Sequence, residues 1–184
     1  VNERATGQSL SKLVESRITK PMKIVGLKYN KAKNDELLPV FSGADDKIRL
    51  ANEGELDIMG KYVPGYESEN KLFLGGEGLI ATADGYADFI RMLLNHGELN
   101  GYRFLNESTV KEMYSPHTQL ENEYGYNGYN LWVTGKLVRE LGQGDEGLWR
   151  GGGYEGTHFW IDPKRDFVGV LMSQMFEAPK SGEG

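Results

Sequence analysis

Glycines are concentrated in one short stretch of this sequence, where the backbone N–H groups could take part in chemistry. The stretch contains, in order, Trp149, Arg150, Gly151, Gly152, Gly153, Tyr154, Glu155, Gly156, Thr157 and His158. Glycines at the head of a strand let another group approach the backbone closely, and backbone N–H groups there can donate to a developing oxyanion. A β-bulge or a tight corner explains the same glycines equally well. The residues alone leave both interpretations open.

Ser9 and Lys12 have the spacing Ser-x-x-Lys, which can bring an amine next to a nucleophilic hydroxyl. A structural explanation competes with this chemistry. Ser9 stands just before the apolar positions Leu10, Leu13 and Val14, where a serine caps a helix N-terminus. Lys12 would then point to solvent, opposite the apolar face. We therefore predict that Ser9 is a helix cap and not a nucleophile.

The pattern Gly76-x-Gly78-x-x-Ala81, with Glu98 about 20 residues further on, loosely matches a dinucleotide-binding fingerprint. That fingerprint requires a parallel βαβ unit. The sequence instead predicts a helix, a turn and another helix after the glycines. We therefore predict an ordinary glycine turn that leads into a helix, and no nucleotide.

The three histidines are His96, His117 and His158. None has a second histidine or a carboxylate at the spacing that metal sites use on a helix face. We predict neither a metal nor a cofactor. Of the three, His158 alone lies near the glycine-rich stretch.

Charge and composition exclude several classes of function. The 184 residues include 21 Lys and Arg against 27 Asp and Glu, which gives a net charge of −6. An acidic chain lacks the cationic surface that phosphate backbones require, so we predict no nucleic-acid partner. With 0 cysteines, disulfides, thiolate metal sites and a cysteine nucleophile are impossible. No apolar run approaches the ~20 residues of a membrane span, and the chain shows no signal peptide.

The elements that must hold the glycine-rich stretch are helices in the first two thirds of the chain and strands in the last. Helices are predicted from Ser9 to Pro21, near 45–51, from Thr82 to His96, and over 107–114. Strands are predicted over 129–133, 136–141, 148–151, 157–161 and 167–172. Residues 1–6 are too few for an element of their own, and 23–71 form a long connection.

The last predicted strand is apolar on both faces. One face carries Phe167, Gly169 and Leu171, and the other carries Val168, Val170 and Met172. Such a strand needs a layer above and a layer below it. The predicted fold class is α+β, an antiparallel sheet with helices on both faces. We treat 1–184 as part of one domain, with a helix and connection (1–71), a helical part (72–116) and a β-sheet part (124–175).

Several segments together resemble the penicillin-recognising serine hydrolases, which comprise class C β-lactamases, D-alanyl-D-alanine carboxypeptidases and family VIII esterases. The similar segments, in the family's order, are 6–10 with 17–22, 75–89, 93–101, 105–110, 156–163 and 168–172. The resemblance implies the β-lactamase/transpeptidase-like fold. The sequence Gly-Thr-His-Phe-Trp-Ile-Asp-Pro at 156–163 favours the esterase and carboxypeptidase-like branch of this family.

The resemblance also shows what this sequence lacks. In the family, the nucleophile motif Ser-x-x-Lys and the motif Tyr-x-Asn both precede the helix that 6–10 resembles. Ser9 and Lys12 therefore stand too late to be that motif, and no Tyr-x-Asn occurs in the chain. We expect a C-terminal portion of a hydrolase domain, incomplete and inactive alone, that is complemented by an N-terminal segment.

The family's third motif lies on the strand that borders the active site, and two registers fit it. Trp149-Arg150-Gly151 keeps the aromatic first residue and makes Gly152 the oxyanion donor. Gly151-Gly152-Gly153 fits the distance to Gly156 better and makes Tyr154 the donor. We favour the first register. The predicted catalytic residues are thus Trp149, Arg150, Gly151 and Gly152, and the predicted substrate-binding residues are Gly153, Tyr154, Glu155 and His158.

The expected substrate is a small ester, amide or peptide. Neither register offers the lysine that binds a substrate carboxylate, although Arg150 could substitute for it. The resemblance implies a periplasmic or secreted location. Two alternatives compete: a non-catalytic module that stacks sugars or peptides on Tyr124, Tyr126, Tyr129 and Trp149, and a degenerate homologue that acts through protein contacts. An incomplete sheet would also leave an open edge, so we expect self-association.

Overall fold

The computed structural model describes residues 2–43, 47–52, 55, 73, 75–76, 78–118 and 125–176. Three short helices and a π-helical turn begin it: α1 (Asn2–Thr6), α2 (Leu10–Val14), η1 (Glu15–Thr19) and α3 (Lys20–Met22). The Ser9 hydroxyl accepts the Lys12 backbone N–H at 3.3 Å, so the predicted cap is confirmed. Two predictions were wrong. Residues 2–6 are helical, and Pro21 does not end the helix, because it occupies the first turn of α3, where a missing N–H costs nothing.

Short strands interrupt the long connection. β1 (Leu27–Tyr29) pairs antiparallel with β4 (Leu79–Ala81). β2 (Phe41–Ser42) lies between β3 (Arg49–Leu50), which is antiparallel to it, and β12 (Met175–Phe176), which is parallel to it. The prediction of a helix near 45–51 was wrong for the described residues of this range, since Arg49 and Leu50 form strand β3.

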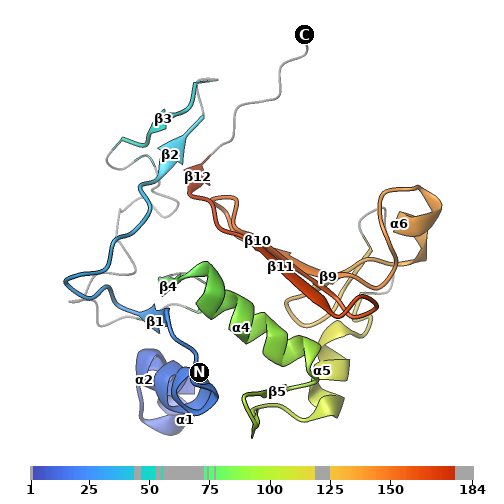
Figure 1. The fold of residues 1–184 in the computed structure, drawn as a ribbon, viewed down its shortest axis with the longest axis horizontal. Helices are drawn as coiled ribbons and strands as arrows, with labels where there is room; N and C mark the ends of the chain where they lie inside the picture. The colour runs from blue at the N-terminus through green and yellow to red at the C-terminus, as the bar shows by residue number, and fades with distance from the viewer. Residues whose placement is uncertain are drawn as a thin grey trace.

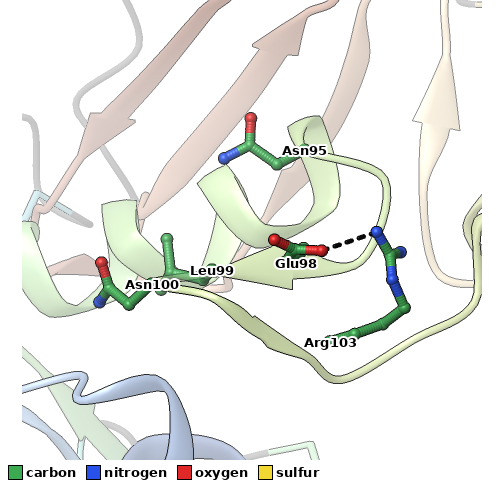
Figure 2. Close-up of a pocket in the computed structure, with 5 residues that line it drawn as sticks. All are labelled: Asn95, Glu98, Leu99, Asn100 and Arg103. Atoms are coloured by element: carbon green, nitrogen blue, oxygen red, sulfur yellow. Dashed lines mark hydrogen bonds and ion pairs between the residues drawn. The ribbon is translucent and has the colours of Figure 1, made fainter.

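The two predicted helices of the middle region are present. Thr82 caps α4 (Ala83–Leu94) by accepting the Gly85 N–H at 3.1 Å, and α5 spans Glu107–Tyr114. Between them, β5 (Glu98–Leu99) and β6 (Tyr102–Arg103) form a hairpin. The side chains of Glu98 and Arg103 form an ion pair at 2.8 Å across this hairpin (Figure 2).

The last third of the chain forms a five-stranded antiparallel sheet. Its strands are β7 (Tyr126–Asn127), β8 (Trp132–Val133), β9 (Trp149–Gly152), β10 (His158–Asp162) and β11 (Phe167–Leu171), in the order β11-β10-β9-β8-β7. The strand predicted over 136–141 is instead a helix, α6 (Lys136–Glu140). Only one apolar side chain of α6, Val138, is buried, and a Lys136–Glu140 pair bridges one helical turn. The strand prediction for this segment was therefore wrong.

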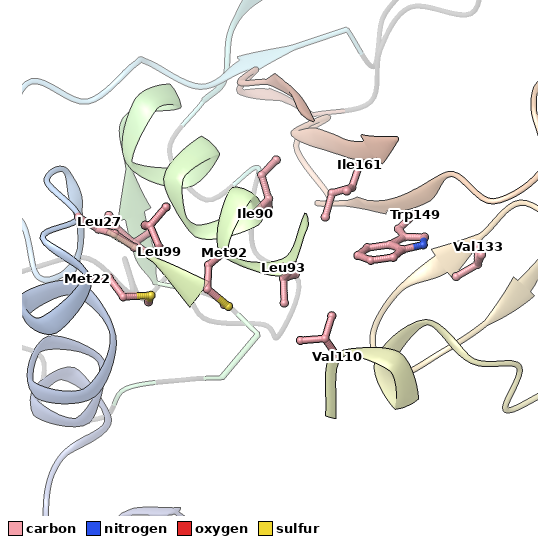
Figure 3. Close-up of a cluster of buried hydrophobic side chains, with 11 residues drawn as sticks. Met22, Leu27, Ile90, Met92, Leu93, Leu99, Val110, Val133, Trp149 and Ile161 are labelled. Atoms are coloured by element: carbon pink, nitrogen blue, oxygen red, sulfur yellow. The ribbon is translucent and has the colours of Figure 1, made fainter. Parts of the chain in front are cut away.

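The hydrophobic core lies between α4 and one face of this sheet (Figure 1). Figure 3 shows the buried cluster, in which α4 contributes Ile90, Met92 and Leu93. The sheet contributes Val133, Trp149 and Ile161, while α5 contributes Val110. The predicted α+β class with an antiparallel sheet is confirmed. The described helices leave the other sheet face partly uncovered, because Trp132, Trp160, Phe167 and Leu171 are all exposed there, as expected of an incomplete fold.

Candidate active-site strand

The first residue of the candidate motif, Trp149, anchors β9 in the core. Its side chain is only 4% exposed, and its ring stacks on Tyr114 at a centroid distance of 4.4 Å and an interplanar angle of 15°. This places the indole among packing residues and not in an open pocket. Its contribution to a site would be to fix the position of the strand.

Two of the glycines on β9 accommodate aromatic rings of β10. A Cβ on Gly151 would lie 2.3 Å from the Phe159 ring, and a Cβ on Gly152 would lie 2.9 Å from Nδ1 of His158. Because Phe159 packs against the core, no side chain fits at Gly151 without displacing it. Part of the glycine signal is thus explained by packing between neighbouring strands.

The backbone at Gly152 has a separate property. Gly153 donates its N–H to the Thr157 carbonyl at 2.7 Å, across to β10. Since N–H groups alternate in direction along a strand, the Gly152 N–H is directed to the opposite edge. On that edge, β8 pairs with Trp149 and Arg150 only. The Gly152 N–H therefore points past the end of β8, as an oxyanion donor must.

The turn after β9 is tied to a distant part of the chain. The Glu155 carbonyl accepts both the Ser173 hydroxyl and the Met175 N–H, each at 2.9 Å. The Thr157 hydroxyl donates to the Ser173 carbonyl at 3.1 Å. Residues 153–157 are thereby fixed against the strand β12 that pairs with β2. Ser173 was not among the predicted site residues. Its position just after a predicted apolar strand was the only feature of the sequence that could have indicated it.

The remaining predicted residues divide between two locations. By strand register, Arg150 shares the uncovered sheet face with Trp132 and Trp160, and His158 lies opposite Gly152 and Leu171. Tyr154, 59% exposed, stands in the turn, as does Glu155. The structure thus groups Gly152, Gly153, Tyr154, Glu155 and His158 around one strand end and places Trp149 and Gly151 toward the core. The two motif registers remain predictions.

Other candidate sites have structural explanations. β4 includes Ala81 of the glycine pattern and pairs antiparallel with β1, which is not a parallel βαβ unit. His117 stacks on Tyr129 at a centroid distance of 3.9 Å. Among the described residues, no group of three or more His, Asp or Glu side chains could hold a metal ion. Within the same residues, no helix has the length and apolar character needed to span a membrane.

Two surface cavities lie away from the glycine-rich strand. One, of about 380 Å³, is formed by the β5–β6 hairpin and the end of α4, and Figure 2 shows its lining residues Asn95, Glu98, Leu99, Asn100 and Arg103. The Arg103 guanidinium there also donates to the His96 carbonyl at 2.9 Å, so its charge is engaged in holding the hairpin. The other cavity, of about 470 Å³, lies beside the start of β11.

A buried carboxylate fixes the hairpin between β10 and β11. Asp162 accepts the backbone N–H groups of Lys164 and Arg165 and an Arg165 guanidinium N–H at 2.6 Å. The hydrogen bond from the guanidinium holds the pKa of Asp162 below its ordinary value, against the effect of burial. Arg165 also pairs with Asp145, which joins this hairpin to the loop before β9.

These elements define the β-lactamase/transpeptidase fold. A solved structure of EstCE1, described as a hydrolase with promiscuous acyltransferase activity, matches 98% of this chain with a TM-score of 0.77 at 16% identity. Simvastatin synthase (LovD) from Aspergillus terreus matches 97% with a TM-score of 0.71 at 17% identity. A family VIII carboxylesterase matches 98% with a TM-score of 0.60 at 17% identity.

The chain belongs to the Beta-lactamase family, whose model matches residues 1–184. The resemblance found in the sequence is thereby confirmed. Protein Rv1367c from Mycobacterium tuberculosis is 28% identical over 144 aligned positions, and the match covers 71% of this chain and 34% of that protein. The chain covers 49% of EstCE1, 48% of LovD and 51% of the carboxylesterase. It therefore spans about half the length of these structures and about a third of the curated relative.

Proposed function

We propose that this chain is the part of a serine hydrolase that supplies the strand bordering the active site and one oxyanion donor. The observation that carries the proposal is the direction of the Gly152 N–H. This N–H is directed away from β10, and on the β8 side it points beyond the Trp132–Arg150 pair, where the pairing of β8 with β9 ends. A backbone N–H fixed in that way can stabilise the oxyanion of an acyl-transfer intermediate without moving during the reaction.

The attacking hydroxyl and its base would come from a segment outside this chain. The Ser9 hydroxyl is already a helix cap, and Lys12 contributes its backbone N–H to that cap. In the complete enzyme, a lysine would take the proton of a serine hydroxyl as the serine attacks the substrate carbonyl. The alcohol or amine would then leave with that proton, and water would hydrolyse the resulting acyl-enzyme. The expected substrate is an ester or amide without a nearby carboxylate, because β9 offers no lysine.

The first test measures the chain alone. We expect no hydrolysis of p-nitrophenyl butyrate or of a chromogenic cephalosporin above background, and no labelling by a fluorophosphonate, which reacts with activated serines. Turnover by the isolated chain that disappears in Ser9→Ala would refute the proposal.

The second test uses a fusion protein in which an N-terminal segment that carries Ser-x-x-Lys and Tyr-x-Asn precedes this chain. In an active joined protein, Gly152→Pro removes the donor N–H and should lower kcat by about 10²–10³-fold. Gly152→Ala is the matched control, because it keeps the N–H and tests the contact with His158. If Tyr154→Pro abolishes turnover and Gly152→Pro does not, the donor is Tyr154 and the second register holds.

The alternative of a sugar- or peptide-stacking module has less support. Of its four proposed aromatic residues, Trp149 is buried in the core and Tyr126 packs against it. Tyr129 is exposed, but one face of its ring is covered by His117. Tyr124 lies outside the described residues. The described aromatic side chains thus do not form a continuous platform.

A further inference from the structure

The turn between β9 and β10, residues 153–157, follows directly after Gly152 and contains the alternative donor Tyr154. Within the turn, the Gly153 N–H donates to the Thr157 carbonyl at 2.7 Å, and the Gly156 N–H donates to the Gly153 carbonyl at 3.1 Å. Two of its five residues are glycines, which lose more conformational freedom on folding than any other residue. A turn of this composition keeps one conformation best when bonds from outside support it.

Bonds of this kind come from the segment that follows β11. The Ser173 hydroxyl and the Met175 N–H both donate to the Glu155 carbonyl, each at 2.9 Å. In the opposite direction, the Thr157 hydroxyl donates to the Ser173 carbonyl at 3.1 Å. Ser173 thus binds the turn through its side chain and through its backbone.

The Ser173 side chain also lies directly against the backbone of Gly156. Gly156 has a φ of 79°, and a Cβ built on it would lie 2.6 Å from the Ser173 Oγ. No side chain therefore fits at Gly156 while the Ser173 hydroxyl holds this position. The glycine at 156 and the serine at 173 form one packed contact in addition to the hydrogen bonds.

The segment that carries Ser173 is itself held in place by β2. β12 pairs parallel with β2, and the Phe41 N–H donates to the Gln174 carbonyl at 2.8 Å just before that pairing begins. β2 pairs in turn with β3. Ser173 therefore joins the turn to a second sheet and not to a free end of the chain.

We propose that Ser173 is a positioning residue for the oxyanion donor, an inference that rests on the proposed function. Its hydroxyl holds the Glu155 carbonyl and its carbonyl holds the Thr157 hydroxyl, so the turn that starts at Gly153 keeps a single position. The Gly152 N–H comes immediately before that turn and keeps its direction only while the turn is fixed. A donor that is fixed before the reaction stabilises the oxyanion without any rearrangement. Ser173 itself touches no reacting atom.

Amide hydrogen exchange followed by NMR tests the support of the turn in the chain itself, without any assay of activity. In Ser173→Ala, the Gly153 and Met175 amides should exchange about tenfold faster than in the unmodified chain, because a bond that holds the turn is lost. The Gly151 amide, which is directed into the β10 ladder, should keep its rate. Ser173→Thr keeps the hydroxyl and should restore the original rates. Ser115→Ala is the matched control, because Ser115 also donates its hydroxyl to a backbone carbonyl, but at the end of α5.

Kinetics of the fusion protein test the catalytic consequence. Ser173→Ala should lower kcat by about tenfold and change KM by less than about twofold, because the variant displaces the donor and removes no substrate contact. Ser173→Thr should restore kcat, and Thr157→Val should lower it to a similar extent as Ser173→Ala. The double variant should lose less activity than the product of the two single losses, because both residues act through one turn.

The outcomes separate this inference from the proposed function. Unchanged exchange at Gly153 and Met175 in Ser173→Ala would overturn the inference in the chain alone. Equally faster exchange at Gly151, Gly153 and Met175 would mean that Ser173 only stabilises the fold, which also overturns it. An unchanged kcat in Ser173→Ala, beside a donor variant that abolishes turnover, would refute the positioning role and leave the donor assignment intact. If neither Ser173→Ala nor either donor variant affects kcat, the proposed function itself is wrong.

Discussion

The five-stranded sheet directs backbone N–H groups away from neighbouring strands in two places, at the end of β9 and along the edge of β11. At β9 the residues around the open amide are glycines, so a small reacting group can reach it. At β11 the residues are valine, phenylalanine and leucine, so another strand can add there but a small polar molecule gains little. The side chains around an unpaired backbone N–H, and not the backbone alone, therefore decide what that N–H can bind.

We expect the largest effect in the rates of amide hydrogen exchange, which should differ between the end of β9 and the edge of β11. The Gly152 amide should exchange at least about a thousandfold faster than the Gly151 amide, which is directed into the β10 ladder. Its rate should not depend on protein concentration. The Val168 and Val170 amides should be fast in dilute protein and slower in concentrated protein, because an open sheet edge favours self-association. The measurement is amide exchange followed by NMR at two concentrations.

Either of two results would contradict the proposed difference between the end of β9 and the edge of β11. A protected Gly152 amide would mean that another group already occupies the β9 position. Val168 and Val170 amides that exchange at one rate in dilute and in concentrated protein would mean that the β11 edge does not take part in self-association.

The sequence was sufficient to predict the helices α4 and α5 and the three strands β9, β10 and β11. Their caps, apolar periodicity and turns all lie within one short segment, as with Thr82 before α4. It was insufficient for α6, because its five residues include only two apolar side chains, at the adjacent positions Leu137 and Val138, and so show no periodicity that separates a short helix from a strand. It also missed the pairing of β2 with β12, because these two-residue strands have no local pattern and are joined by contacts more than 130 residues apart in sequence.

The candidate site could be located but not resolved from the sequence. The glycine-rich stretch indicated the end of β9 as the candidate site, and this location stays a prediction. The burial of Trp149 and the fit of Phe159 over Gly151 could not be predicted, since both depend on which face of β9 meets α4 and α5. The Ser173 contacts that fix the turn are equally non-local.

Replacing a glycine of β9 and one of β11 should change the free energy of unfolding by different amounts. Gly151 and Gly169 each lie beneath an aromatic ring of β10, since a Cβ would approach Phe159 to 2.3 Å and Trp160 to 2.1 Å, respectively. Phe159 packs against the core, whereas Trp160 is 36% exposed and can turn toward solvent. Gly151→Val should therefore lower the free energy of unfolding by about 3 kcal/mol, and Gly169→Val by less than about 1 kcal/mol. Urea denaturation of both variants measures the difference, and equal losses would show that Trp160 is held as firmly as Phe159.

The smallest expected effect concerns Asp162, which supports β11 but not the end of β9. Its pKa is lowered in the folded state, chiefly by the Arg165 guanidinium, so its carboxylate stabilises the fold above the ordinary pKa and this contribution is lost as the pH falls. Asp162→Asn should cost about 1 kcal/mol at pH 7. The cost should be constant down to about pH 5 and should shrink below about pH 4. Urea denaturation across this range measures it, with Asp166→Asn as the control in the same turn. A cost that grows as the pH falls would mean that the folded protein holds Asp162 in its protonated form.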